Sequence, residues 1–184
     1  MGVHVGGVPK CDLSWGYLLM IFVTVGSQKF QFDRLLKAID DLVEKKIISE
    51  EVFAQIGYSE YLPQYYAYAK FLNCTEFEEK IAASDLVITH GGTGVIMKSV
   101  KSGKKVIAVP RLVRYHEHVD DHQMQLIEQF TNSNLISSCL DLDKLGDVCL
   151  ETREKMFASY QSNTENIINS ICQYIDQIYL GDVK

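Results

Sequence analysis

The sequence has few of the features that divide a chain into separate parts. Its 184 residues include only three prolines and neither an internal repeat nor a low-complexity stretch, so we expect one folded domain. A basic excess is also missing, because 18 lysines and arginines stand against 24 aspartates and glutamates and give a net charge of −6. Binding to nucleic-acid phosphates needs a basic face, so the composition argues against nucleic-acid partners.

Cysteine pairs with the spacing of a metal site are missing as well. The five cysteines are scattered and odd in number, and none forms a C-x-x-C pair. This pattern provides neither a zinc site nor a disulfide framework, and it fits a reducing cytoplasm. We therefore expect no metal, and we interpret most cysteines as small core residues.

No apolar run is long enough for a transmembrane helix. The longest, 15–25, ends at Gly26-Ser27, and no small-residue cleavage site follows before a strand–turn–helix pattern begins. Residues 1–19 lack periodicity, and we expect them to be an N-terminal extension, either non-native or disordered. The folded domain is expected at 20–184, without a direct membrane span.

Short apolar runs alternate with amphipathic segments along the chain. Strands are expected at 20–25, 52–56, 67–72, 86–89, 106–109 and 135–136. Helices are expected at 32–46, at 75–83 with Thr75 and Glu78 as a capping box, at 95–105, at 120–130 and at 151–180. This alternation predicts an α/β fold, a Rossmann-like parallel sheet flanked by helices.

A glycine-rich turn, Gly91, Gly92 and Gly94, joins the apolar run 86–89 to the next helical segment. Such a turn leaves free backbone N–H groups at a helix N-terminus, whose partial positive charge suits an anion such as a diphosphate. Glycine also lets the backbone approach the anion closely. The motif is neither the dinucleotide fingerprint nor the P-loop, so a purely structural turn is the alternative.

Three polar segments follow expected strands: the turn Gly26-Ser27, the glycine turn and the loop 110–121. Because ligands of parallel sheets bind at the carboxyl ends of the strands, we expect all three on one rim. Gly26 and Ser27 are therefore candidates for a place near a nucleotide. An ordinary strand-to-helix turn is the alternative interpretation.

Several polar side chains near this rim have two interpretations. Arg111 either adds a charge-assisted bond to a diphosphate or is a surface charge. Asp120 fits a helix N-cap, but His122 and Gln123 add hydrogen-bonding groups that a cap does not need, which favours contact with a sugar. His90 is a catalytic candidate or a packed histidine that orients the turn. The pair His116 and His118 is too small a set for a metal site and instead indicates a ligand-site loop.

Three segments together resemble the donor-binding half of GT-B glycosyltransferases of the family 28 C-terminal-domain type. They are FVTVGSQKFQFDRLL at 22–36, SDLVITHGGTGVIMKSVKSGKKVIAVPR at 84–111 and EHVDDHQMQLIEQF at 117–130. The resemblance extends over 20–179 and is strongest to two kinds of split enzyme. One is the catalytic subunit that adds the second N-acetylglucosamine to a dolichol-linked oligosaccharide, and the other serves bacterial capsule and exopolysaccharide synthesis.

This resemblance implies a single GT-B C-terminal-type domain, a UDP-sugar donor, inversion at the anomeric carbon, and no metal or other cofactor. It places the donor diphosphate on Gly91, Gly92, Thr93 and Gly94, and the donor sugar on Asp120, His122 and Gln123. Arg111 joins the diphosphate candidates only through its place at a strand end. Lys98 stands where many relatives have a glutamate that binds the ribose. Since a lysine cannot accept hydrogen bonds from a diol, ribose recognition must differ here.

Split members of the family pair with a membrane-associated chain that binds the acceptor. The resemblance thus implies a lipid-linked saccharide acceptor and a cytoplasmic, peripheral place at the inner face of the membrane. No general base is evident in this sequence, and a base must reach the acceptor hydroxyl, so we expect the catalytic base on the partner. We expect a catalytic subunit that transfers a hexose, galactose in preference to glucose or N-acetylglucosamine, in capsule or exopolysaccharide synthesis. The alternative is a non-catalytic nucleotide-sugar-binding module that enhances a partner glycosyltransferase. A reductase ranks last because the dinucleotide fingerprint is missing.

Overall fold

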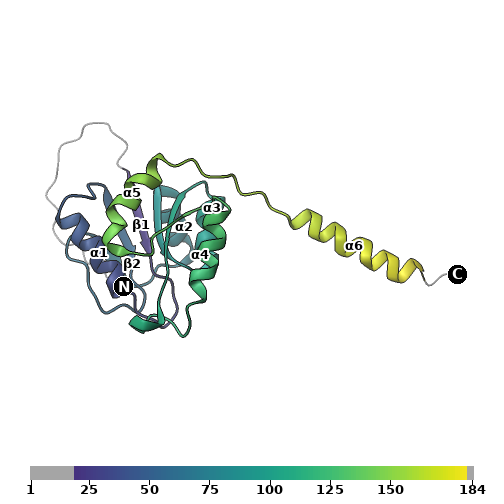
Figure 1. Cartoon of the computed structure of the whole chain (residues 1–184), viewed down its shortest axis with the longest axis horizontal. Coiled ribbons are helices and arrows are strands. Elements are labelled where there is room, and N and C mark those ends of the chain that lie inside the picture. Colours follow the sequence, from purple (N-terminus) through teal and green to yellow (C-terminus); the bar gives the residue numbers. More distant parts are fainter. Residues whose placement is uncertain (1–18, 182–184) are drawn as a thin grey trace.

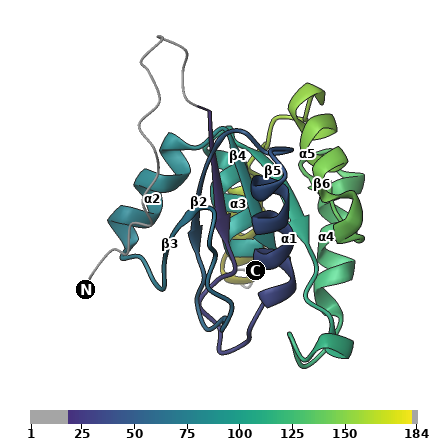
Figure 2. The ribbon, with the colours of Figure 1, turned by 90° about the vertical axis from the view of Figure 1, so that its left-hand side faces the viewer.

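The computed structural model describes residues 19–181 and contains one sheet of six parallel strands in the order β3-β2-β1-β4-β5-β6 (Figure 2). The strands are β1 (Met20–Thr24), β2 (Glu51–Gln55), β3 (Ala67–Ala69), β4 (Leu86–His90), β5 (Lys105–Val109) and β6 (Ser137–Ser138). The expected α/β fold with a parallel sheet is confirmed. The extension expected at 1–19 lies, except for Leu19, outside the described residues.

Helices cover both faces of the sheet. They are α1 (Asp33–Glu44), α2 (Cys74–Ala83), α3 (Thr93–Lys101), α4 (His122–Asn132) and α5 (Leu145–Glu154), with short 3-10 turns η1 (Val113–Tyr115) and η2 (Leu142–Lys144). Side chains of β1 alternate between two cores: Ile21 and Val23 pack with α1 and α5, whereas Phe22 packs with α2, α3 and α4. Burial on both faces explains why the central strands are continuous apolar runs.

The strand order reverses at the centre of the sheet. β1 leads through β2 to β3 on one side, while β4 lies on the other side of β1 and leads to β5 and β6. The register pairs Thr24 with Thr89, so the turns after β1 and β4 lie next to each other. A reversal of this kind opens a crevice at the carboxyl ends of the strands, where α/β sheets bind ligands.

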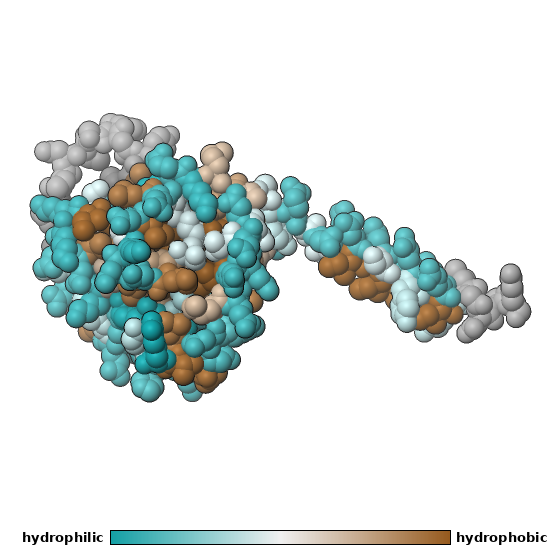
Figure 3. Space-filling view, viewed as in Figure 1, coloured by the Kyte–Doolittle hydropathy of each residue, from teal (hydrophilic) through white to brown (hydrophobic). Residues whose placement is uncertain are grey.

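The last helix, α6 (Thr164–Gly181), stands away from the domain (Figure 1). Every described side chain of α6 is exposed, and its apolar residues lie along one side (Figure 3). The prediction of a single helix at 151–180 is therefore wrong, because α5 ends at Glu154 and residues 155–163 are not helical. Ser162 and Asn163 favour this break, since both side chains hydrogen-bond locally at the start of α6.

Two smaller expectations are also corrected. The capping box of α2 is formed by Asn73 and Glu76, whose side chains and backbone amides bond reciprocally, and not by Thr75 and Glu78. β6 consists of Ser137–Ser138 because these residues pair with β5, while the preceding Ile136 belongs to the core. No helix within residues 19–181 combines the length and apolar character needed to span a membrane.

Candidate functional site

The two glycine turns meet at the centre of the rim, and the ring of His90 fills the space between them. His90 ends β4 and is 8% exposed. A Cβ on Gly26 would lie 2.5 Å from His90 Cε1, and a Cβ on Gly92 would come closer still to Nε2. Both turns therefore need glycine for the ring to fit, and at Gly26 the positive φ of 80° adds a backbone reason.

His90 is an uncharged ring in this site. Burial and the cation of Arg111 lower the pKa of His90 to about 4. Its Nδ1 lies 3.3 Å from the hydroxyl of Thr89, which donates to the backbone oxygen of Thr24 at 3.0 Å. These contacts support the interpretation of His90 as a packed histidine that orients both turns.

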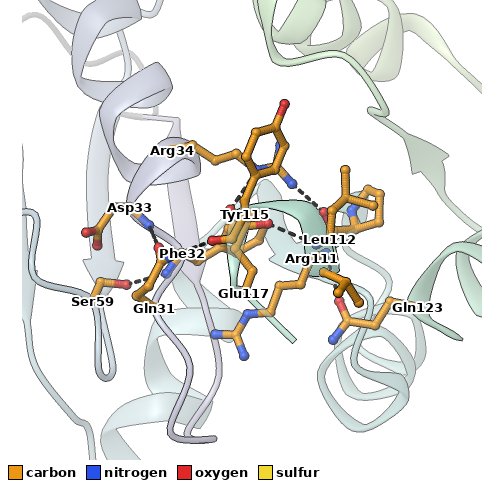
Figure 4. A network of polar contacts seen from close by, with 12 residues as sticks. Gln31, Phe32, Asp33, Arg34, Ser59, Arg111, Leu112, Tyr115, Glu117 and Gln123 are labelled. Carbon is orange, nitrogen blue, oxygen red and sulfur yellow. Dashed lines mark hydrogen bonds and ion pairs between the residues drawn. The ribbon is translucent and has the colours of Figure 1, made fainter. Parts of the chain in front are cut away.

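Arg111 follows β5 and is completely buried, so its interpretation as a surface charge is wrong. Its Nη2 donates to the backbone oxygens of Val25 and Phe30. Its Cζ lies 5.5 Å from the ring centroid of Phe32, and both side chains are drawn in Figure 4. Nε and Nη1 have no hydrogen-bond partner within residues 19–181. Burial lowers the pKa of Arg111 to about 10, which still leaves a cation at neutral pH. Arg111 holds the turn after β1 in place, and direct contact with a ligand would require that turn to open.

The N-terminus of α3 is open to ligands. Gly92 is its N-cap, and no side chain caps it. Thr93 and Gly94 are exposed, and the N–H groups of Thr93, Gly94 and Val95 donate to no other described residue. A Cβ on Gly94 would meet nothing within 4 Å. Free amides at an accessible helix N-terminus are suited to a phosphate group.

Gln123 connects the glycine turn to the neighbouring strand. Its Oε1 accepts the backbone N–H groups of both Gly91 and Arg111, each at 3.1 Å. A Cβ on Gly91 would lie 2.7 Å from Gln123 Cβ, so this glycine lets α4 approach. Because the oxygen is occupied, only Nε2 of the buried Gln123 remains for the sugar contact implied by the resemblance.

Asp120 and His122 are exposed at the start of α4. Asp120 Oδ1 accepts the backbone N–H of His122 at 3.0 Å, although the N-cap residue itself is Asp121. Asp121 instead accepts the N–H of Val113. The side chain of His122 makes no hydrogen bond to a described residue and is accessible to a ligand.

An ion pair between Arg34 and Glu117 was not expected from the sequence. Glu117 is 1% exposed, and its Oε1 lies 2.7 Å from Arg34 Nε, while Oε2 accepts the N–H of Leu112 (Figure 4). Arg34 also donates to the backbone oxygen of Pro110. The network fixes the loop after β5 to α1. Both side chains lie within the segments that resemble the family, but no local pattern pairs them.

Lys98 points to a neighbouring helix. Its Nζ lies 2.6 Å from Glu78 Oε1 on α2, and both side chains are substantially exposed. A hollow of about 320 Å³ adjoins the rim at the start of α4 and is lined by Leu112, Arg114, Asp121, Met124 and Leu140. Within residues 19–181, no group of three or more histidine, cysteine, aspartate or glutamate side chains is arranged to hold a metal ion.

Solved structures that share this fold include a glycotransferase and ALG13. The chain aligns with the glycotransferase of kitacinnamycin at a TM-score of 0.59 and 16% identity, covering 84% of this chain and 39% of that one. It aligns with the solution structure of ALG13 at a TM-score of 0.55 and 17% identity, covering 78% of this chain and 90% of that one. At these identities the structures show a shared fold.

Sequence comparison identifies the family. A stretch of 48 residues is 44% identical to the UDP-N-acetylglucosamine transferase subunit ALG13 of Candida glabrata; it amounts to 26% of this chain and spans only 22% of that protein. The family model described as "Glycosyltransferase family 28 C-terminal domain" matches residues 20–178, from β1 into α6. The chain therefore belongs to the glycosyltransferase family 28 C-terminal domain family.

Proposed function

We propose that the chain is the donor-binding, catalytic subunit of an inverting glycosyltransferase. It transfers a hexose from a UDP-sugar to a lipid-linked saccharide in capsule or exopolysaccharide synthesis. One observation carries the proposal: in a domain of this family, the open N-terminus of α3 lies at the point where the strand order reverses. Fixed amides at that point stabilise the negative charge that grows on the leaving diphosphate.

Each rim residue has a role in this proposal. The free amides of Thr93, Gly94 and Val95, with the Thr93 hydroxyl, hold the diphosphate without a metal. The amide of Gly92, which was expected to join them, instead donates to the backbone oxygen of His90 at 2.8 Å. His122 contacts the donor sugar together with Asp120 and the free Nε2 of Gln123. The turn Gly26-Ser27 lies near the nucleotide, and Arg111 and His90 keep that turn in position.

The donor sugar is proposed to be galactose, as the motifs of capsule enzymes imply, with glucose as a further candidate. The name of the Candida glabrata relative makes UDP-N-acetylglucosamine an equally important donor to test. The same name, which describes a transferase subunit, supports a nucleotide-sugar donor and an enzyme with more than one chain.

A partner chain is proposed to bind the acceptor and to supply the catalytic base. α6 supports a partner because its exposed apolar side includes Ile168, Ile171 and Ile175, yet contacts nothing in the domain. The described side chains of α6 include only two charged groups, Glu165 and Asp176, and both are acidic. A helix without cations is poorly suited to anionic lipid, so a membrane-associated protein is the proposed contact. It would hold the chain peripherally at the cytoplasmic face.

The first test is calorimetric titration of the chain with UDP-galactose, UDP-glucose, UDP-N-acetylglucosamine and NADH. We expect binding of at least one UDP-sugar and none of NADH. His122→Ala should weaken UDP-sugar binding about tenfold and leave UDP binding unchanged, because His122 is proposed to touch only the sugar. Gln125→Ala, an exposed change on the same helix, is the control. Binding of NADH but of no UDP species would refute the proposal.

The second candidate function is a non-catalytic nucleotide-sugar-binding module that enhances another transferase. Transfer activity separates it from the main proposal. We expect little transfer by the isolated chain, full transfer with its partner, and loss of that activity in His122→Ala. Undiminished activity of the reconstituted His122→Ala enzyme would favour the module. Gln123→Ala is a poorer probe because it also removes the brace on Gly91 and Arg111.

A further inference from the structure

His118 and Asp120 form a histidine–carboxylate pair on the rim. His118 Nδ1 lies 3.1 Å from Asp120 Oδ1 and 3.2 Å from the backbone oxygen of Asp120. Two oxygens at this distance favour the tautomer with the proton on Nδ1. The backbone N–H of Asp120 lies farther away, at 3.4 Å, and competes weakly for the same nitrogen. Nε2 is then the nitrogen available to a ligand, and no described residue bonds to it.

The ring of His118 is held in place from a second side. Its centroid lies 5.2 Å from that of Phe30, in the turn after β1, and its side chain is only 16% exposed. The ring is thus fixed between the turn after β1 and the loop before α4. A fixed imidazole with one nitrogen held by a carboxylate and the other free is the arrangement of a functional histidine.

The charges around His118 are nearly balanced without a ligand. His118 lies close enough to His90 to influence its protonation, as does Arg111. On its own loop His118 is near Asp120 and Glu117, and Glu117 is neutralised by Arg34 from α1. Apart from His118 itself, the cations Arg34 and Arg111 match the two carboxylates. A proton on His118 would add a positive charge to the rim that carries the N-terminus of α3, and an anion bound there would stabilise it.

We propose that His118, oriented by Asp120, contacts the donor diphosphate through Nε2 and takes up a proton as the donor binds. The inference rests on the proposed function. As the sugar–phosphate bond breaks, its electron pair passes to the phosphate oxygen, and the Nε2–H of the cationic ring stabilises that charge by a hydrogen bond. His118 would supply at the leaving group the positive charge that a metal supplies in other transferases.

Calorimetry of the full chain with UDP-galactose, UDP-glucose and UDP-N-acetylglucosamine tests this role, because their diphosphates do not titrate near neutral pH. Titrations in buffers with different heats of ionisation measure the protons taken up on binding. We expect net uptake near pH 7 that disappears in His118→Asn. Affinity in this variant should fall about tenfold at pH 6 and little at pH 8. A merely structural role would weaken binding equally at both pH values.

Two further variants complete the test. His116→Asn changes a neighbouring exposed histidine with a left-handed φ of 57°, which asparagine tolerates, and should keep the wild-type proton uptake. Asp120→Asn keeps an oxygen for the N–H of His122 but removes the charge beside His118, so it should reduce the uptake. Binding without proton uptake, or uptake that persists in His118→Asn, overturns this inference alone. Failure of the wild type to bind any UDP-sugar overturns the proposed function and this inference together.

Discussion

Gly92 lies so close to His90 that a methyl group there would overlap the ring. Its torsions, φ −79° and ψ 117°, suit any residue, so the ring and not the backbone requires glycine. We expect Gly92→Ala to lower the free energy of unfolding by about 1–3 kcal/mol, measured by urea denaturation, because the ring or the turn must move. Gly94→Ala is the control, with an expected change of about 0.5 kcal/mol or less, since a Cβ there meets nothing. Equal losses in both variants would contradict the role assigned to the ring.

Burial of the neutral His90 ring also predicts how stability depends on pH. The folded protein holds the pKa of His90 at about 4, below its ordinary value of 6.5, so the unfolded chain binds more protons between these values. Above pH 6.5 the histidine imposes no penalty. As the pH falls from 6.5 toward 4, the folded state loses up to roughly 3 kcal/mol relative to the unfolded chain. Between pH 7.5 and 5, the free energy of unfolding measured by denaturation should therefore fall less in His90→Asn than in the wild type.

The control for this pH dependence is His122→Asn, which changes an exposed histidine of the same rim. It should keep the wild-type slope of stability against pH. If His90→Asn also kept that slope, another group would be responsible for the acid sensitivity.

At the scale of elements, the sequence predicts what depends on local pattern. Continuous apolar runs identify β1, β4 and β5, because strands buried on both faces need apolar side chains at every position. The glycine turn and the rim follow from the order of strand and helix, since parallel strands end on one edge. The sequence does not reveal the boundary between α5 and α6, because apolar residues continue through it. Only the local bonds of Ser162 and Asn163 mark the break.

Contacts between distant segments could not be predicted in the same way. From the sequence, Arg111 is either a diphosphate contact or a surface charge. In the fold it is buried, and its Nη2 donates to the backbone oxygens of Val25 and Phe30. From the sequence, the side chain of Gln123 is predicted to contact a sugar. In the structure its oxygen already accepts hydrogen bonds from two backbone amides. Sequence patterns identify which residues gather on the rim, but long-range pairing determines which atoms remain free for a ligand.

For the molecule as a whole, the main question is what covers α6. A single amphipathic helix in water is marginal unless its apolar side is packed. The family match runs to residue 178, so α6 is a shared part of this kind of domain and not an appendage. Its distance from the sheet indicates that the domain does not need it for folding (Figure 1).

Removal of residues 162–184 should therefore separate folding from assembly. We expect the shortened chain to keep its melting temperature within about 2 °C and its affinity for UDP-sugar. The full chain should sediment with membranes of its own cell and not with protein-free vesicles of their lipids, while the shortened chain should sediment with neither. A fall of more than about 5 °C would show that α6 packs on its own domain.

Charge substitutions in the full chain decide which side of α6 is responsible. Ile171→Glu with Ile175→Glu places two charges on the apolar side and should abolish sedimentation with membranes, because a buried carboxylate without a partner is costly. Asn169→Glu with Gln173→Glu adds the same charge to the exposed polar side and should leave it intact. Loss of sedimentation in both double variants would show that the net charge of α6, and not its apolar side, controls membrane association. Binding of the full chain to protein-free vesicles would show that α6 contacts lipid and not a protein partner.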